Sequence, residues 1–243
     1  TTFTEIWSDC HVYDIPAVTV VEVMGRHTGW LTASSALATE IGRGPDLIYL
    51  PEIVFDKDRF VADVKEILAR KAAVIVAVSE GLQYSNGKFV GEGAEHSQAD
   101  AFGHKRLSGA AKVLEHIICS EIGCKVRAIE FSLMQRASGH LTSDVDLTEG
   151  RMLGAVALDR AIEGTSGQVA VLNRISENPY KVKYSSVDVQ KVANHEKPVP
   201  KHWINEAGNY VTKEMIEYLR PLIGIAEENK YCNGLPNHLH FVR

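Results

Sequence analysis

The segment Met24-Gly25-Arg26 begins at the last residue of the apolar, β-branched run AVTVVEVM (17–24), which is expected to form a buried strand. A glycine at such a turn lets the backbone come close to a ligand, and the free N–H groups of a following helix point at any anion bound there. The guanidinium of Arg26 adds a planar donor for a phosphate. The same residues are also compatible with an ordinary tight turn and a solvated arginine, so the spacing leaves both interpretations open.

Two other predicted strands also carry charged residues near their ends. Glu80 ends the run AAVIVAVSE and could accept hydrogen bonds from sugar hydroxyls, although a solvated acid beside a glycine turn is the alternative. Arg136, with Gln135 beside it, falls just past a strand predicted for residues 125–134, and Arg127 falls near its start. Nine extended residues at about 3.3 Å each would span about 30 Å, so one small ligand is not expected to contact both arginines from one subunit. Three arginines and a glutamate at strand ends indicate a phosphorylated polyol without naming the reaction, and each arginine is also compatible with a plain surface residue.

The strands and helices that must position these residues alternate along the chain. Strands are predicted for residues 17–24, 47–52, 72–80, 125–134, 168–174 and 180–188. Helices are predicted for residues 1–9, 25–41 after an initial turn, 58–71, 106–123, 144–164 and 212–220, and Thr2 with Glu5 is expected to form a capping box. The aperiodic residues 82–104 are expected to form a loop at the ligand-binding edge. This order favours an α/β fold with an open, mostly parallel sheet and helices on both faces.

Composition narrows the class of protein. The 243 residues carry 26 Lys and Arg against 31 Asp and Glu, a net charge of −5, so nucleic acid is not expected as a partner. No apolar run reaches the roughly 18 residues needed to span a membrane, so no membrane partner is expected. The 4 cysteines are too few and too scattered for a disulfide framework, which favours a cytoplasmic protein. A nicotinamide-binding domain is excluded because no G-x-G-x-x-G run follows a strand.

The stretch VVEVMGRHTGWLTASSALA (20–38) strongly resembles the phosphofructokinase family. A strand ending in LPE, a strand ending in SEG and an arginine-bearing strand closing on QR follow in family order, so the resemblance covers nearly the whole chain. The stretches VYDIPAVTV, LMQR, ASGHL and YLRPLI look most like the pyrophosphate-dependent branch. The resemblance implies transfer of a phosphoryl group from Mg²⁺-pyrophosphate to the 1-hydroxyl of fructose 6-phosphate, a step of glycolysis.

The resemblance also implies roles for individual residues. Met24, Gly25 and Arg26 match the turn that holds fructose 6-phosphate, and Arg26 also matches a catalytic arginine that steadies the transferring phosphoryl group. Glu80 matches the carboxylate that grips the sugar hydroxyls. Arg136 matches the arginine that holds the 6-phosphate.

The remaining matched residues surround Arg136 or belong to a neighbouring subunit's site. Leu133, Met134 and Gln135 occupy the substrate-binding stretch, where a His or Tyr often stands at the position of Leu133; only the backbone of Leu133 could help. Arg127 matches an arginine that reaches into the neighbouring subunit's sugar site, which implies a homo-oligomer with two-fold symmetry.

The resemblance divides the chain into a sugar-phosphate-binding α/β domain (1–136), a segment returning toward the donor-binding domain (137–190) and a C-terminal arm and helix (191–243). The family's Gly-rich GGD phosphate loop and its TIDND segment, which holds the general base, are not found in this sequence, so we expect a fragment or a cleavage product. Mg²⁺ is expected to enter with the donor, with no metal ligands in this chain. The alternatives are an ATP-dependent 6-phosphofructokinase and a non-catalytic sugar-phosphate-binding subunit.

Overall fold

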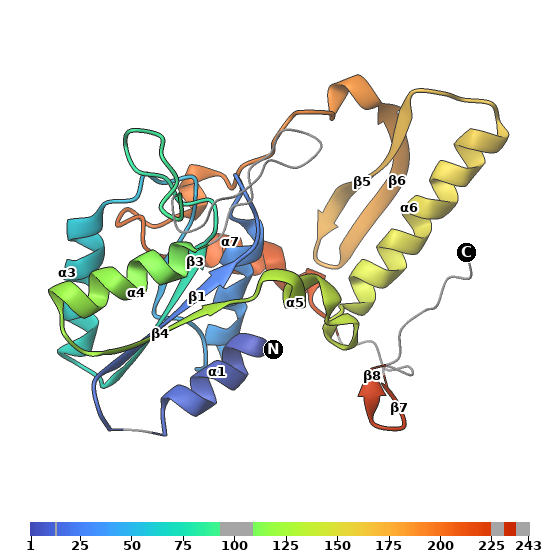
Figure 1. Ribbon diagram of the computed structural model, residues 1–243. Helices are drawn as coiled ribbons and strands as arrows, with labels where there is room; N and C mark the ends of the chain where they lie inside the picture. The colour runs from blue at the N-terminus through green and yellow to red at the C-terminus, as the bar shows by residue number, and fades with distance from the viewer. Residues whose placement is uncertain (13, 93–108, 225–230, 237–243) are drawn as a thin grey trace. The chain divides into compact units, whose positions relative to one another are not determined.

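The computed structural model describes residues 1–12, 14–92, 109–224 and 231–236 (Figure 1). Internal contacts divide the chain into two compact units. The first unit consists of Thr1–Arg136 and Lys197–Ile216, and the second of Ala137–Glu196 and Glu217–Arg243. The loop predicted for 82–104 and the helix predicted for 106–123 lie partly outside the described residues.

A parallel sheet forms the centre of the first unit (Figure 1). Its strands are β1 (Ala17–Val23), β2 (Leu47–Tyr49), β3 (Ala73–Ser79) and β4 (Lys125–Glu130), in the order β2-β3-β1-β4. Side chains are buried along almost all of β1 and β3, which lie inside the sheet, and this explains their continuous apolar sequence. Along β4, at the edge, exposed and half-buried side chains are mixed. The predicted open parallel sheet is confirmed.

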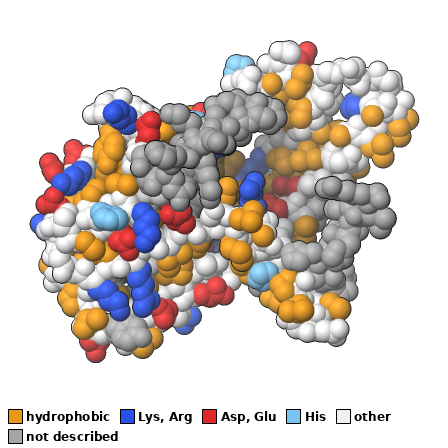
Figure 2. All heavy atoms as spheres, viewed as in Figure 1, with side chains coloured by type: hydrophobic (Ala, Val, Ile, Leu, Met, Phe, Trp, Pro, Cys, Tyr) orange, Lys and Arg blue, Asp and Glu red, His pale blue; other side chains and the backbone are white. Residues whose placement is uncertain are grey.

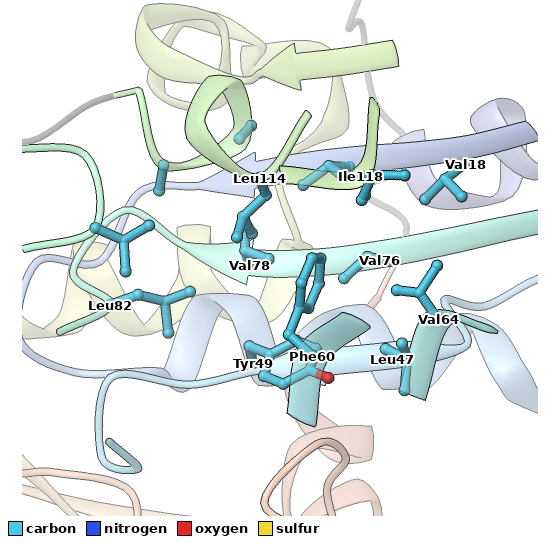
Figure 3. Close-up of a cluster of buried hydrophobic side chains, with 14 of the residues drawn as sticks. Val18, Leu47, Tyr49, Phe60, Val64, Val76, Val78, Leu82, Leu114 and Ile118 are labelled. Atoms are coloured by element: carbon cyan, nitrogen blue, oxygen red, sulfur yellow. The ribbon is translucent and has the colours of Figure 1, made fainter. Parts of the chain in front are cut away.

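Helices α3 (Lys57–Leu68) and α4 (Ala110–Glu121) pack on one face of this sheet. One buried cluster joins both helices to the valines of β1 and β3, and Figure 3 shows among its members Phe60, Val64, Leu114 and Ile118. These side chains are spaced three or four residues apart on their helices, which gives each helix one apolar stripe. Ile75 and Ala77 alternate with the clustered valines of β3 and are also fully buried, so the opposite face of the sheet is covered as well.

The first helices differ in detail from the prediction. The helix α1 (Thr2–Cys10) forms where it was predicted, but Thr1 is its N-cap and no side chain caps it, so the predicted Thr2 and Glu5 capping box is wrong. The turn predicted at the start of residues 25–41 is present, and in it Thr28 N donates to Gly25 O over 3.1 Å. The helix that follows is α2 (Trp30–Ala33), and it continues as a 3₁₀ helix over Ser34–Ile41, where a regular helix was predicted.

The strand predicted for residues 125–134 is too long. β4 ends at Glu130, and the chain turns sharply at Ser132, whose φ is +43°, into the short helix α5 (Ser132–Ala137). A left-handed backbone at a non-glycine residue breaks the strand, although the apolar sequence continues through Leu133 and Met134. The extended-chain estimate for the separation of Arg127 and Arg136 is therefore also wrong, because part of that segment is helical.

The second unit holds the long helix α6 (Asp144–Ile162) and an antiparallel hairpin of β5 (Gln168–Glu177) and β6 (Tyr180–Asp188). Ser143 caps α6 by accepting a hydrogen bond from Val145 N. The sequence predicted these two strands but suggested a single sheet; they form their own two-stranded sheet. A smaller hairpin of β7 (Tyr231–Cys232) and β8 (Leu235–Pro236) was not anticipated. Across both units, the described residues also form the helix α7 (Lys213–Leu219) and short 3₁₀ helices at Gly139–Leu141, Val189–Lys191, Lys201–Trp203 and Arg220–Leu222.

Large hydrophobic side chains are exposed along α6, among them Leu147, Met152, Leu158 and Ile162. Figure 2 shows hydrophobic side chains on the surface of the second unit in this view. Several exposed large hydrophobic side chains on one helix are typical of a surface that packs against another element.

Candidate functional site

The candidate residues of three parallel strands meet at one edge of the sheet. The segment from Met24 to Arg26 directly follows β1, Glu80 follows β3, and α5 follows β4. Because β1 pairs with both β3 and β4 in parallel, the carboxyl ends of all three strands lie together. At this edge Met24 forms hydrogen bonds with Gln135, and Gly25 and Arg26 form hydrogen bonds with Glu80.

Glu80 holds the turn through its backbone. Its Oε1 accepts hydrogen bonds from Gly25 N and Arg26 N, each over 3.1 Å, and the residue is only 7 % exposed. A side chain on Gly81 would place its Cβ 1.5 Å from the carbonyl oxygen of Arg26. Glycine is therefore required at position 81 for the turn to lie against the end of β3, and the SEG and MGR motifs fit together as one structure.

Arg26 has a φ of +49°, in the left-handed region that side chains other than glycine rarely adopt. This conformation costs on the order of 1–2 kcal/mol, which is offset by the two hydrogen bonds that Gly25 N and Arg26 N donate to Glu80. Arg26 is exposed at the carboxyl ends of the strands. Residues with a strained backbone cluster at active sites and ligand-binding segments.

Gln135 reaches from α5 to the first residue of the turn. Its Oε1 accepts a hydrogen bond from Met24 N over 2.9 Å, and its Nε2 donates to Met24 O over 3.3 Å. Neighbouring Leu133 and Met134 are 63 % and 66 % exposed, and Arg136 is also exposed. The side chain of Leu133 has no polar group, so it cannot form the hydrogen bond that a His or Tyr could form at this position.

Arg127 is not brought to this edge. It is the third residue of β4 and lies in register with Thr19, toward the amino end of β1. Its guanidinium forms an exposed ion pair with Asp9, with 2.8 Å between Nη1 and Oδ2. Within one chain the structure therefore groups the turn with Glu80 and Gln135 and leaves Arg127 apart.

Glu22 is a buried carboxylate near this edge that the sequence analysis passed over. It is 4 % exposed, and its two oxygens accept hydrogen bonds from Gly109 N (3.3 Å) and Ala111 N (2.9 Å) at the start of α4. Burial raises the pKa of the Glu22 carboxyl to about 7, and the nearby Glu130 and Glu80 carboxylates add to this rise. The sequence feature that could have identified Glu22 is its place as the one acidic residue in the run AVTVVEV.

Glu52, the last residue of the LPE motif, is a second carboxylate that holds backbone amides. Its Oε1 accepts hydrogen bonds from Gly29 N and Val199 N, each over 2.8 Å. Trp30 Nε1 donates to Lys197 O over 2.7 Å beside it. These contacts attach the segment Lys197–Ile216 to the first unit.

The described part of the chain contains no group of three or more His, Cys, Asp or Glu side chains that could hold a metal ion. None of the helices in the described ranges is long and apolar enough to cross a membrane.

The sequence profile of the phosphofructokinase family matches residues 14–137, roughly half of the chain. The matched range contains every candidate residue from Met24 to Arg136.

Individual relatives match over nearly the whole chain. The chain is 37 % identical over 221 residues to a pyrophosphate–fructose 6-phosphate 1-phosphotransferase of Halomonas elongata, covering 90 % of this chain and 52 % of the relative. It is 36 % identical over 227 residues to a protein of the same name from Xanthomonas campestris, covering 91 % of this chain and 53 % of the relative. The crystal structure of a pyrophosphate-dependent phosphofructokinase from Nitrosospira multiformis superposes with a TM-score of 0.82 at 32 % identity, covering 98 % of this chain and 56 % of that one. The chain thus spans about half the length of the curated relatives it matches.

Proposed function

This chain belongs to the phosphofructokinase family, and from that premise we propose that it forms the sugar-phosphate-binding portion of a phosphotransferase acting on fructose 6-phosphate. The observation that carries the proposal is the meeting of the Met24–Arg26 turn, Glu80 and α5 at one sheet edge. Two exposed arginines, Arg26 and Arg136, follow strands that end there, and they provide positive charge for a phosphorylated ligand.

Each of these residues has a defined role in the proposed reaction. Arg136 binds the 6-phosphate, and the Glu80 carboxylate orients the sugar beside the turn that it holds. The sugar O1 bonds to the transferred phosphorus as the bond from phosphorus to the bridging oxygen of pyrophosphate breaks, and the hydroxyl proton passes to a base. Arg26 offsets the charge that develops on the transferring group. Such a transfer needs positioning and charge neutralisation more than covalent chemistry from the protein.

Pyrophosphate is the proposed phosphoryl donor, arriving as its Mg²⁺ complex. The names of the relatives from Halomonas elongata and Xanthomonas campestris support pyrophosphate over ATP. The donor site, the Mg²⁺ ligands and the base are proposed to lie in the portion of the relatives that this chain does not match. All four cysteines are free thiols, which supports a reducing, cytoplasmic setting for the enzyme.

The segment 137–190 is proposed to return to that donor-binding portion. The exposed hydrophobic side chains of α6 support this role, because such a face needs a partner that the described residues do not provide. Residues 191–243 are proposed to act as the C-terminal arm and helix. Arg127 lies away from the carboxyl ends of the strands, where the candidate site is. It is proposed to serve the sugar site of a second subunit in a two-fold homo-oligomer.

The proposal is tested by assaying the complete protein with fructose 6-phosphate and either pyrophosphate or ATP, following the formation of fructose 1,6-bisphosphate. We expect turnover with pyrophosphate. Turnover with ATP alone would favour the ATP-dependent alternative. Binding of fructose 6-phosphate without turnover from either donor would favour a non-catalytic sugar-phosphate-binding subunit, and no binding at all would overturn the proposal.

A further inference from the structure

The pairing of β1 with β4 stops before the candidate site begins. The last residues in register are Glu22 and Glu130, and Phe131 N makes one further hydrogen bond to Glu22 O over 3.1 Å. The chain then turns away at Ser132 into α5. Met24, two residues beyond Glu22, has therefore lost the neighbouring strand that would pair with its backbone.

The side chain of Gln135 takes the place of that strand. Its amide presents one acceptor and one donor, as a peptide group does, and both bind the backbone of Met24: Oε1 to the N–H over 2.9 Å and Nε2 to the carbonyl over 3.3 Å. The two bonds define the orientation of the amide, because a flipped amide would set Nε2 against the Met24 N–H. The sheet pairing is thus extended by one residue through a side chain that is 111 residues away in the sequence.

We propose that Gln135 is a positioning residue, which fixes the substrate turn to α5 and does not itself bind the sugar. Each polar atom of its side chain makes a hydrogen bond to Met24, so the amide is oriented by the turn, with one further N–H left on Nε2 and one further lone pair on Oε1. Glu80 holds the next two amides, of Gly25 and Arg26, so three successive N–H groups of the turn are bound by side chains. Gln135 is the member of this set that links the turn to the helix carrying Arg136.

This inference rests on the proposed function and makes it more specific. The phosphate-binding Arg136 and the Arg26 turn need a fixed separation to bind opposite ends of one sugar phosphate. Without Gln135, α5 keeps its own backbone bonds, such as Met134 N to Phe131 O over 3.0 Å, but the turn is released from it. The loss should therefore weaken sugar binding while the fold persists.

The test combines amide hydrogen exchange with kinetics on the complete protein. Gln135→Ala removes both bonds, and Gln135→Met removes them while keeping the volume of the side chain, which provides a second variant if the first does not fold. Gln190→Ala is the matched control, because Gln190 is exposed and only its backbone N–H, which donates to Asp188, makes a hydrogen bond. We expect faster exchange of the Met24 amide than in the wild type, with the amide of Val21 inside β1 unchanged. We also expect the KM for fructose 6-phosphate to rise about fivefold to tenfold, with little change in KM for the donor.

The two measurements separate this inference from the proposed function. Unchanged exchange at Met24 in the Gln135 variants would overturn the tether, whatever the substrate of the protein. Faster exchange with an unchanged KM for the sugar would overturn the positioning role. If the wild type does not use fructose 6-phosphate at all, the proposed function fails, and the positioning role fails with it, even where the exchange data establish the tether.

Discussion

Arg127 of β4 and Asp9 of α1 form an ion pair across the surface of the first unit, with 2.8 Å between the charged groups. Both side chains are exposed, so the pair contributes no more than about 1 kcal/mol to stability. Arg127 can therefore exchange this partner for a phosphate at little cost. We expect Arg127→Ala to lower activity strongly, and Asp9→Ala, which breaks the same ion pair but keeps the arginine, to leave activity and melting temperature nearly unchanged.

Mixing two impaired variants of the complete protein, assayed at a low concentration of fructose 6-phosphate, tests whether this arginine serves a neighbouring subunit. In a mixed dimer of Arg127→Ala and Arg136→Ala subunits, one site carries both changes and the other carries neither. Some activity should return after subunit exchange. If exchange is demonstrated and no activity returns, Arg127 does not complete a shared site.

Arg136→Ala should weaken binding of fructose 6-phosphate far more than binding of the donor. Arg136 is exposed on α5 beside the Met24–Arg26 turn, and a charge-assisted contact to a phosphate contributes roughly 1.5–3 kcal/mol. The KM for the sugar should therefore rise at least about tenfold in steady-state kinetics. Arg70→Ala is a suitable control, since Arg70 is an exposed arginine just after the end of α3 that pairs with Glu66. An unchanged sugar KM in Arg136→Ala would contradict the phosphate role.

Glu80→Gln tests charge separately from structure. Glutamine keeps an oxygen that can accept the amides of Gly25 and Arg26, so the turn should stay in place while the negative charge is lost. We expect a rise of about threefold to tenfold in the KM for the sugar, with a small change in melting temperature. Glu80→Ala removes the acceptor as well and should lower both affinity and stability. A large loss of melting temperature in Glu80→Gln with normal sugar binding would indicate a purely structural carboxylate.

The main strands and the sheet edge could be predicted from the sequence because their signals are local. The runs that form β1 and β3 are apolar throughout, and the residues after them mark where the strands end. This was sufficient to bring Met24, Gly25, Arg26 and Glu80 to one edge.

The remaining features depend on contacts that no local pattern reports. The end of β4 is set by the left-handed backbone of Ser132, in a stretch whose apolar residues continue past it. The bonds of Gln135 to Met24, and of Glu80 to Gly25 and Arg26, join residues 111, 55 and 54 positions apart. A sequence pattern identifies such residues as polar and well placed, but it does not tell whether they bind a ligand or the backbone.

Glu22 should make the stability of the protein depend on pH. Burial raises the pKa of its carboxyl from about 4.5 to about 7, so between these values the folded state binds more protons than the unfolded state. The free energy of unfolding should therefore fall as pH rises from about 4.5 to 7, by up to on the order of 3 kcal/mol, and change no further from this group above that range. Glu22→Gln should abolish this fall, at a fixed cost of about 1 kcal/mol because one oxygen that accepts an amide from α4 is replaced by a donor.

Chemical denaturation of both proteins from pH 5 to 8 measures the effect, with the exposed Glu66→Gln as the control. Other groups also titrate in this range, so the decisive quantity is the difference between the two profiles. Parallel profiles for the wild type and Glu22→Gln would show that Glu22 is already ionised in the folded protein at pH 5.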